Sequence, residues 1–373
     1  MVPRRVPAAG NALRCTLLLV LVAAGGRQLQ TSAVALPSDQ PDEQSRAAAA
    51  EGHIDKELQL AGDYLIGRGI RRSPEQAVCW YRKAADQGDP DAQAELGYFY
   101  LAGTGVRADP AEAVRWFSRA MAGGSLSAER NLAVMYLKGM GVRRDLRLGM
   151  EMLTQAAHRD DPGAENDLGV AYFLGLGVPV DHRAAEKWFE RAAKQRLPEA
   201  EYAMGTLYSV VGDHVHDFPR AAQYLRISVQ GGYVPALHSL GQLLVNHPEI
   251  PQKPGEATAF LEQAAEAGAW RSSAILGALA RMGTFAPASP ADACRWFLIA
   301  ARQGGSEAQP TLKNDLANCT NVLGAQSMDQ QSRQAEAWLA QHAAPAIFLS
   351  GSRFQTGNFP LPEVPDLDLF SNR

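Results

Sequence analysis

The residues whose types suggest chemistry are few, and the densest group lies in one expected loop. His214 and His216 are flanked by Asp213 and Asp217, and imidazole and carboxylate groups are common zinc ligands. The alternative is a solvated loop in which Asp217 caps the helix that follows it. We favour the loop, and we predict neither a metal site nor a cofactor.

Motifs of hydrolases and nucleotide-binding enzymes are absent from the sequence. It contains no HExxH, GxSxG, CxxC or GxxxxGK[ST] pattern. Pairs of glycines such as Gly67 and Gly69 resemble phosphate-binding loops, but they recur at a fixed spacing and follow expected helices instead of strands. We interpret them as helix ends, and we predict that the protein is not an enzyme.

The sequence repeats every 36 residues, without gaps, from about Ile54 to Ala308. The helices of these repeats must therefore position any binding side chains in this range. Each copy has a large apolar residue followed by a small one, and in the first five copies a tyrosine stands three positions further on. This spacing predicts one face of a helix. The large and small residues are Leu60 and Ala61, Leu96 and Gly97, Leu132 and Ala133, Leu168 and Gly169, Met204 and Gly205, Leu240 and Gly241, and Leu276 and Gly277.

A second helix is predicted in every copy. Its start signal occupies one column, where a side-chain oxygen can accept a hydrogen bond from the first turn: Ser73, Asp109, Asp145, Asp181, Asp217, Lys253 and Ser289. Its apolar face places aromatic rings beside alanines, as at Trp116, Phe117 and Ala120. We expect the small residues of the first helix to leave space for these rings.

The pattern LG-x-x-Y…G-x-GV-x-x-D…A-x-x-W[YF]-x-(K/R)AA, as it stands from Leu168 to Ala193, resembles the Sel1-like repeat family, which is related to the tetratricopeptide solenoids. The resemblance implies an all-α fold, a right-handed α/α superhelical solenoid of seven 36-residue helix pairs with a C-terminal capping helix. It also implies a protein-interaction adaptor, which in bacteria is often exported to the periplasm or cell surface. The fifth and sixth copies depart from the pattern because they lack the paired glycines.

Residues 1–35 have the properties of a signal peptide. The first 38 residues contain arginines but no acidic residue, and the apolar run from Cys15 to Ala24 is too short to span a bilayer. Cleavage could follow Ala24 or Ala35. We expect an exported protein of the periplasm or cell envelope; an organellar transit peptide is the alternative, and an uncleaved leader would make a membrane-tethered scaffold.

The rest of the chain divides by composition. We predict a polar linker over 36–52, seven repeats over 53–308, capping helices over 309–343 around Ala335, Trp338 and Leu339, and an extended or disordered tail over 344–373. The whole chain has a net charge of −4, and removing residues 1–35 takes away only arginines among its charged residues. The mature chain is therefore expected neither to bind nucleic acid nor to insert into a membrane.

Three cysteines remain after residue 35. An odd number cannot be fully paired within one chain. Cys79 lies about six repeats from the others, so we expect it to be free. Cys294 and Cys319 could form a disulfide, or they could be two half-buried small apolar residues.

One side of the first helices is expected to bind a partner. Successive side chains of a helix are about 100° apart, so some positions of each first helix point away from the large, small and tyrosine positions of its core face. In successive repeats these positions form a lane of apolar side chains with polar residues at its edges. We expect about half of the lane to pack against the neighbouring repeat and the remainder to accept an extended or helical protein segment. The candidate residues are Glu95, Tyr98, Phe99, Asn131, Val134, Met135, Lys138, Asp167, Val170 and Leu174.

The sequence thus predicts a non-catalytic, exported adaptor that binds a protein or peptide on the concave face of a solenoid. One alternative comes from the resemblance, because some cysteine-rich members of the family are labelled as binding or hydrolysing β-lactams. This chain lacks their cysteine pattern and an S-x-x-K motif. The partner's identity does not follow from the sequence.

Overall fold

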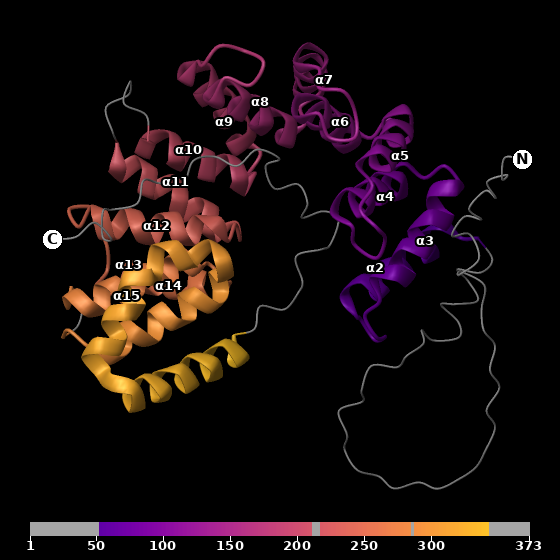
Figure 1. Cartoon of the computed structure of the whole chain (residues 1–373). Helices are drawn as coiled ribbons and strands as arrows, with labels where there is room; N and C mark the ends of the chain where they lie inside the picture. The colour runs from indigo at the N-terminus through magenta and orange to yellow at the C-terminus, as the bar shows by residue number, and fades with distance from the viewer. Residues whose placement is uncertain (1–51, 211–216, 285–286, 343–373) are drawn as a thin grey trace, which may run out of the picture. The chain divides into compact units, whose positions relative to one another are not determined.

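The computed structural model describes residues 52–210, 217–284 and 287–342, and within these ranges the chain forms fourteen helices (Figure 1). They are α2 Ile54–Ile66, α3 Pro74–Asp86, α4 Pro90–Ala102, α5 Pro110–Ala122, α6 Leu126–Lys138, α7 Leu146–His158, α8 Pro162–Leu174, α9 His182–Lys194, α10 Pro198–Val210, α11 Phe218–Gln230, α12 Pro235–Asn246, α13 Glu256–Glu266, α14 Trp270–Met282 and α15 Pro290–Gln341. The predictions for residues 1–51, for His214 and His216, and for the tail lie outside the described residues.

The helices belong to two units. Unit 1 contains α2 to α5 and α6 as far as Met135, and unit 2 contains α7 to α15. From α2 to α5, and again from α7 to α15, each helix packs against the next one along the chain (Figure 1). In unit 2, α8 also contacts α10, and α12 contacts α14, so first helices of neighbouring repeats touch. The prediction of an all-α solenoid of helix pairs is confirmed.

Side-chain caps start most of the second helices where the sequence predicted. Asp109 Oδ1 accepts hydrogen bonds from the backbone N–H groups of Ala111 and Glu112, each at 3.1 Å, which satisfies two donors that a helix start leaves unpaired. The prediction at Lys253 is wrong by two residues, because the cap is Gly255, whose φ is +77°, and α13 begins at Glu256. A lysine side chain cannot accept the capping hydrogen bond.

The small residues of the first helices do leave space for the rings of the second helices. A Cβ atom added to Gly97 would lie 2.6 Å from Phe117 Cε1, and one added to Gly169 would lie 2.5 Å from Phe189 Cδ1. Phe117 and Phe189 are fully buried. The glycines therefore allow a close approach between the two helices of a repeat that no other residue type permits.

The last helix, α15, is interrupted at Gly305 and Gly324, which have φ of +51° and +71°. Its first part is the second helix of the seventh repeat, and a disulfide between Cys294 and Cys319 joins that part to the next. Of the two interpretations of these cysteines, the structure has the disulfide. The prediction that Cys79 is free is wrong, because this cysteine is also disulfide-bonded.

Among the described residues, none of the helices combines the length and the hydropathy that crossing a bilayer requires.

Candidate functional site

The predicted lane is largely interior in unit 1. Tyr98 and Phe99 on α4 are 5% and 1% exposed, and Asn131, Val134 and Met135 on α6 are also buried. Asn131 donates a hydrogen bond from Nδ2 to the Tyr98 hydroxyl at 2.6 Å, and the Tyr98 ring meets Phe117 edge to face at a centroid distance of 5.2 Å. These contacts hold α4, α5 and α6 together, so these five candidate residues belong to the packed part of the lane and do not offer an exposed surface to a partner.

Glu95, the remaining lane residue of unit 1, is a poorly paired carboxyl. Its Oε2 atom is inaccessible and has no hydrogen-bond partner. Burial and, to a smaller extent, the nearby Asp91 carboxylate raise the pKa of Glu95 to about 7. Glu95 is therefore partly protonated near neutral pH, and the stability of unit 1 is expected to depend on pH through this carboxyl.

The lane residues of unit 2 are split between interior and surface. Asp167 and Val170 on α8 are 2% and 1% exposed, so they too belong to the packed part of the lane. Lys138 and Leu174 remain exposed, and Lys138 lies close enough to Asp167 for their charges to interact. Only these two of the ten candidates keep an exposed side chain on which a partner could bind directly.

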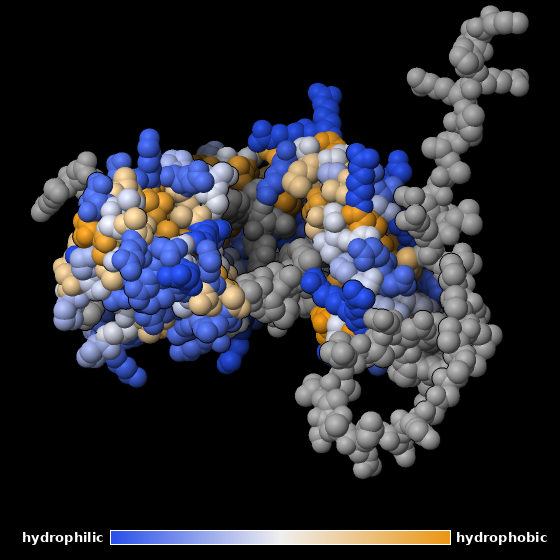
Figure 2. Space-filling model, turned by 60° about the horizontal axis from the view of Figure 1, so that its bottom comes forward, coloured by the Kyte–Doolittle hydropathy of each residue, from blue (hydrophilic) through white to orange (hydrophobic). Residues whose placement is uncertain are grey.

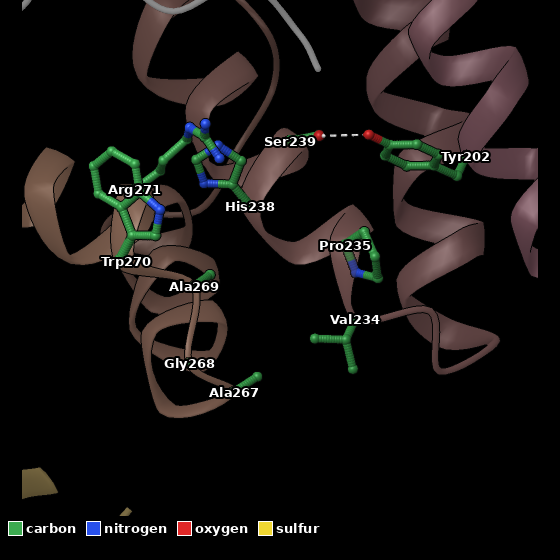
Figure 3. A pocket seen from close by; sticks show the side chains of 10 residues that line it. All are labelled: Tyr202, Val234, Pro235, His238, Ser239, Ala267, Gly268, Ala269, Trp270 and Arg271. Carbon is green, nitrogen blue, oxygen red and sulfur yellow. Dashed lines mark hydrogen bonds between the residues drawn. The ribbon is translucent and has the colours of Figure 1, made fainter. Parts of the chain in front are cut away.

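A pocket of about 300 Å³ lies on the same side of the first helices, further along unit 2 (Figure 3). Trp270 and the turn Ala267–Ala269 form one wall, and Tyr202 with Val234 and Pro235 forms the other, while His238 lies between them. The complete lining is Tyr202, Val234, Pro235, His238, Ser239, Ala267, Gly268, Ala269, Trp270 and Arg271. The pocket is thus built from the starts of α12 and α14 and from the buried face of α10.

Hydrogen bonds fix the polar side chains of the pocket. His238 Nδ1 and Ser272 Oγ are 2.7 Å apart, and Ser239 donates from Oγ to the Tyr202 hydroxyl at 3.4 Å (Figure 3). Because Tyr202 and His238 are nearly buried, their positions are set by the fold before any ligand binds. The pocket is therefore preorganised and lined by aromatic groups with a few polar atoms, as ligand sites generally are.

The guanidinium of Arg271 supplies positive charge at the rim. It lies over the Trp270 ring, with Cζ 4.8 Å from the ring centroid, and its Nη2 is 3.0 Å from Glu307 Oε1. Glu307 is 64% exposed, and ion pairs of such exposure are weak because water competes with them. A carboxylate of a ligand could therefore compete with Glu307 for the guanidinium of Arg271.

Sequence reasoning missed the pocket, and of its lining only Ser239 stands in a column that the candidate lane includes. Ser239 occupies the same repeat column as Glu95, four copies further on. The available signal was Trp270, which stands in the column where three other copies have proline at the start of the first helix. There it packs on Gly304, where an added Cβ would lie 2.7 Å from Trp270 Cγ, and its ring extends into the pocket wall.

Seven large hydrophobic residues of the described ranges have exposed side chains. They are Ile66, Met121, Leu174, Val180, Ile227, Met282 and Val322. The face drawn in Figure 2 accordingly shows hydrophobic residues interspersed among hydrophilic ones.

No group of three or more histidine, cysteine or acidic side chains in the described residues is arranged to hold a metal ion. Asp217 accepts a hydrogen bond from the backbone N–H of Arg220 at 3.0 Å and so caps α11, while His214 and His216 lie outside the described residues.

Repeated helix pairs that stack on their neighbours define the class: this is an α-helical repeat protein of the solenoid type. The Sel1 repeat profile matches seven segments, residues 57–89, 90–125, 126–161, 162–197, 198–233, 234–268 and 273–305. The chain belongs to the Sel1 repeat family.

Two solved structures resemble this chain at 28% sequence identity. A Sel1 repeat protein from Oxalobacter formigenes matches 68% of this chain and 99% of its own, with a TM-score of 0.56. The protein c5321, a protective antigen of uropathogenic Escherichia coli, matches 80% of this chain with a TM-score of 0.50, and this chain spans only 63% of that antigen's length. No curated protein matched the sequence.

Proposed function

We propose that the protein is a non-catalytic, exported adaptor that binds a protein or peptide segment on the side formed by the first helices of its repeats. The observation that carries this proposal is the preorganised pocket of Tyr202, His238 and Trp270, which lies on that side. A pocket about 300 Å³ in volume is at the small end of ligand sites. It suits one large side chain of a bound segment better than a whole cofactor.

The site chemistry favours binding over catalysis. His238 is the pocket's only histidine, and its Nδ1 is engaged with Ser272. No carboxylate lines the pocket to orient this imidazole as a general base. Neither the β-lactam alternative nor the tethered-scaffold alternative gains support from a described residue.

Replacing Trp270 with proline should remove partner binding while preserving the fold. Proline already stands in this column at Pro90, Pro162 and Pro198, and the first helical position needs no N–H donor. With the chain from Leu36 as bait and envelope extract of the source cells as prey, we expect a specific protein to be retained by the unchanged chain and lost by Trp270→Pro.

Trp188→Leu is the matched control. Trp188 is half-buried on α9 and, like Trp270, lies beneath an arginine, with Arg191 Cζ 4.8 Å from its ring centroid. This variant should retain the same protein as the unchanged chain. Equal retention by Trp270→Pro would show that the pocket is not the binding site.

Export is supported by the Cys294–Cys319 disulfide, because disulfides persist in oxidising compartments and are rare in the cytosol. It is also supported by the description of one solved relative as a protective antigen. Mass spectrometry of the protein from fractionated source cells should find it in the envelope or medium with Gly25 or Leu36 as its first residue. A cytosolic protein that begins at Met1 would refute export.

A further inference from the structure

The position where the described chain ends suggests a ligand for the pocket. His342 follows α15 directly, and its Nε2 is 3.7 Å from Glu266 Oε1. Glu266 immediately precedes the turn Ala267–Ala269 that forms a wall of the pocket. The end of α15 is held there by aromatic contacts, because His342 stacks on Trp338 at 4.3 Å and Trp338 meets Trp296 at 5.4 Å.

We propose that the C-terminal segment Asp366–Phe370 of this same chain binds in the pocket, with Phe370 between Trp270 and Tyr202 and a carboxylate of the segment on Arg271. This inference rests on the proposed function, since it names a ligand for the same site. Bound in this way, the segment competes with the protein partner for the pocket and so lowers the apparent affinity of the chain for that partner.

The chemistry of the segment matches the pocket. Its sequence is Asp-Leu-Asp-Leu-Phe, so one aromatic side chain is preceded by two carboxylates. An aromatic ring gains from edge or face contacts with other rings, which the walls of the pocket offer at Trp270 and Tyr202. Arg271 can bind a carboxylate with two parallel hydrogen bonds once its weak pairing with Glu307 is released.

The length of the chain allows this contact. Twenty-seven residues separate His342 from Phe370, and each extended residue spans about 3.3 Å. A tethered segment of this kind has an effective concentration on the order of millimolar, so even a weak interaction with a Kd of about 100 μM would leave the pocket roughly 90% occupied.

The test uses the full chain from Leu36 and a fluorescein-labelled peptide of residues 359–373 as probe. The unchanged chain should bind the probe weakly because its own segment competes. Phe370→Ala in the full chain should raise the affinity for the probe about tenfold. Adding Trp270→Pro to that variant should abolish binding, whereas adding Trp188→Leu should not. A probe affinity that is the same with and without Phe370→Ala would overturn the proposal, as would binding that survives Trp270→Pro.

The two proposals can fail separately. If Trp270→Pro loses the partner but the probe never binds, the proposed adaptor function is supported and the C-terminal segment is not the ligand of the pocket. If the probe binds as expected but partner retention is unaffected by Trp270→Pro, the segment is the ligand of the pocket and the partner binds elsewhere. Circular dichroism melting of each variant confirms that loss of binding is not loss of fold.

Discussion

Glu95→Gln is expected to stabilise the protein at pH 8 and to have little effect at pH 4. The pKa of Glu95 is raised by burial from 4.5 to about 7, so the folded state holds its proton more tightly than the unfolded state does. The stability that this proton contributes is fully present below pH 4.5 and is lost as the pH rises through 7. Because one pKa unit corresponds to about 1.4 kcal/mol, the total is about 3 kcal/mol.

The measurement is the free energy of urea unfolding of both chains from pH 4 to pH 8. The difference between them should grow by about 3 kcal/mol over this range. Asp91→Asn is the diagnostic second variant, since the Asp91 carboxylate raises the pKa of Glu95. It should shift the pH dependence to lower pH without removing it. A difference that stays constant with pH would mean that the carboxyl is solvated.

Gly169→Ala is expected to destabilise unit 2 by about 1–3 kcal/mol, the usual cost of inserting a methyl group into a filled core. The added Cβ would lie 2.5 Å from two carbons of the fully buried Phe189 ring. Alanine improves helix propensity over glycine by about 1 kcal/mol, so a net loss of stability would show that packing outweighs propensity.

Gly62→Ala is the control for Gly169→Ala. Gly62 lies inside α2, and an added Cβ there would meet no atom within 4 Å. This substitution should therefore raise the midpoint of urea unfolding, whereas Gly169→Ala should lower it. If both substitutions moved the midpoint in the same direction, the close approach of α8 and α9 would not be a determinant of stability.

The sequence was sufficient for the helix pairs because their determinants are local. A capping residue such as Asp109 satisfies its own helix start, and the pairing of Gly97 with Phe117 depends on two residues twenty positions apart in one repeat. Both recur every 36 residues. The start of α13 was misplaced where this local signal fails, at Lys253.

The candidate site could not be predicted to the same extent. A helical projection gives the direction in which the Tyr98 side chain leaves α4. It does not show that Asn131 Nδ2, in the next repeat, lies 2.6 Å from the Tyr98 hydroxyl oxygen. Burial of the lane depends on how closely neighbouring repeats approach, and this is set by side chains in both repeats. The pocket arises where one repeat departs from the others. Trp270 stands at the repeat position where three other copies have proline, and Gly304 leaves space for its ring.

The central claim is that protein segments bind between the starts of α12 and α14. Hydrogen–deuterium exchange of the chain with and without its captured partner tests it most directly. We predict slower exchange in Val234–Ser239 and Ala267–Arg271 when the partner is bound, with α9 unchanged. Slower exchange in α9 alone, or no change at the pocket with saturating partner, would contradict the claim.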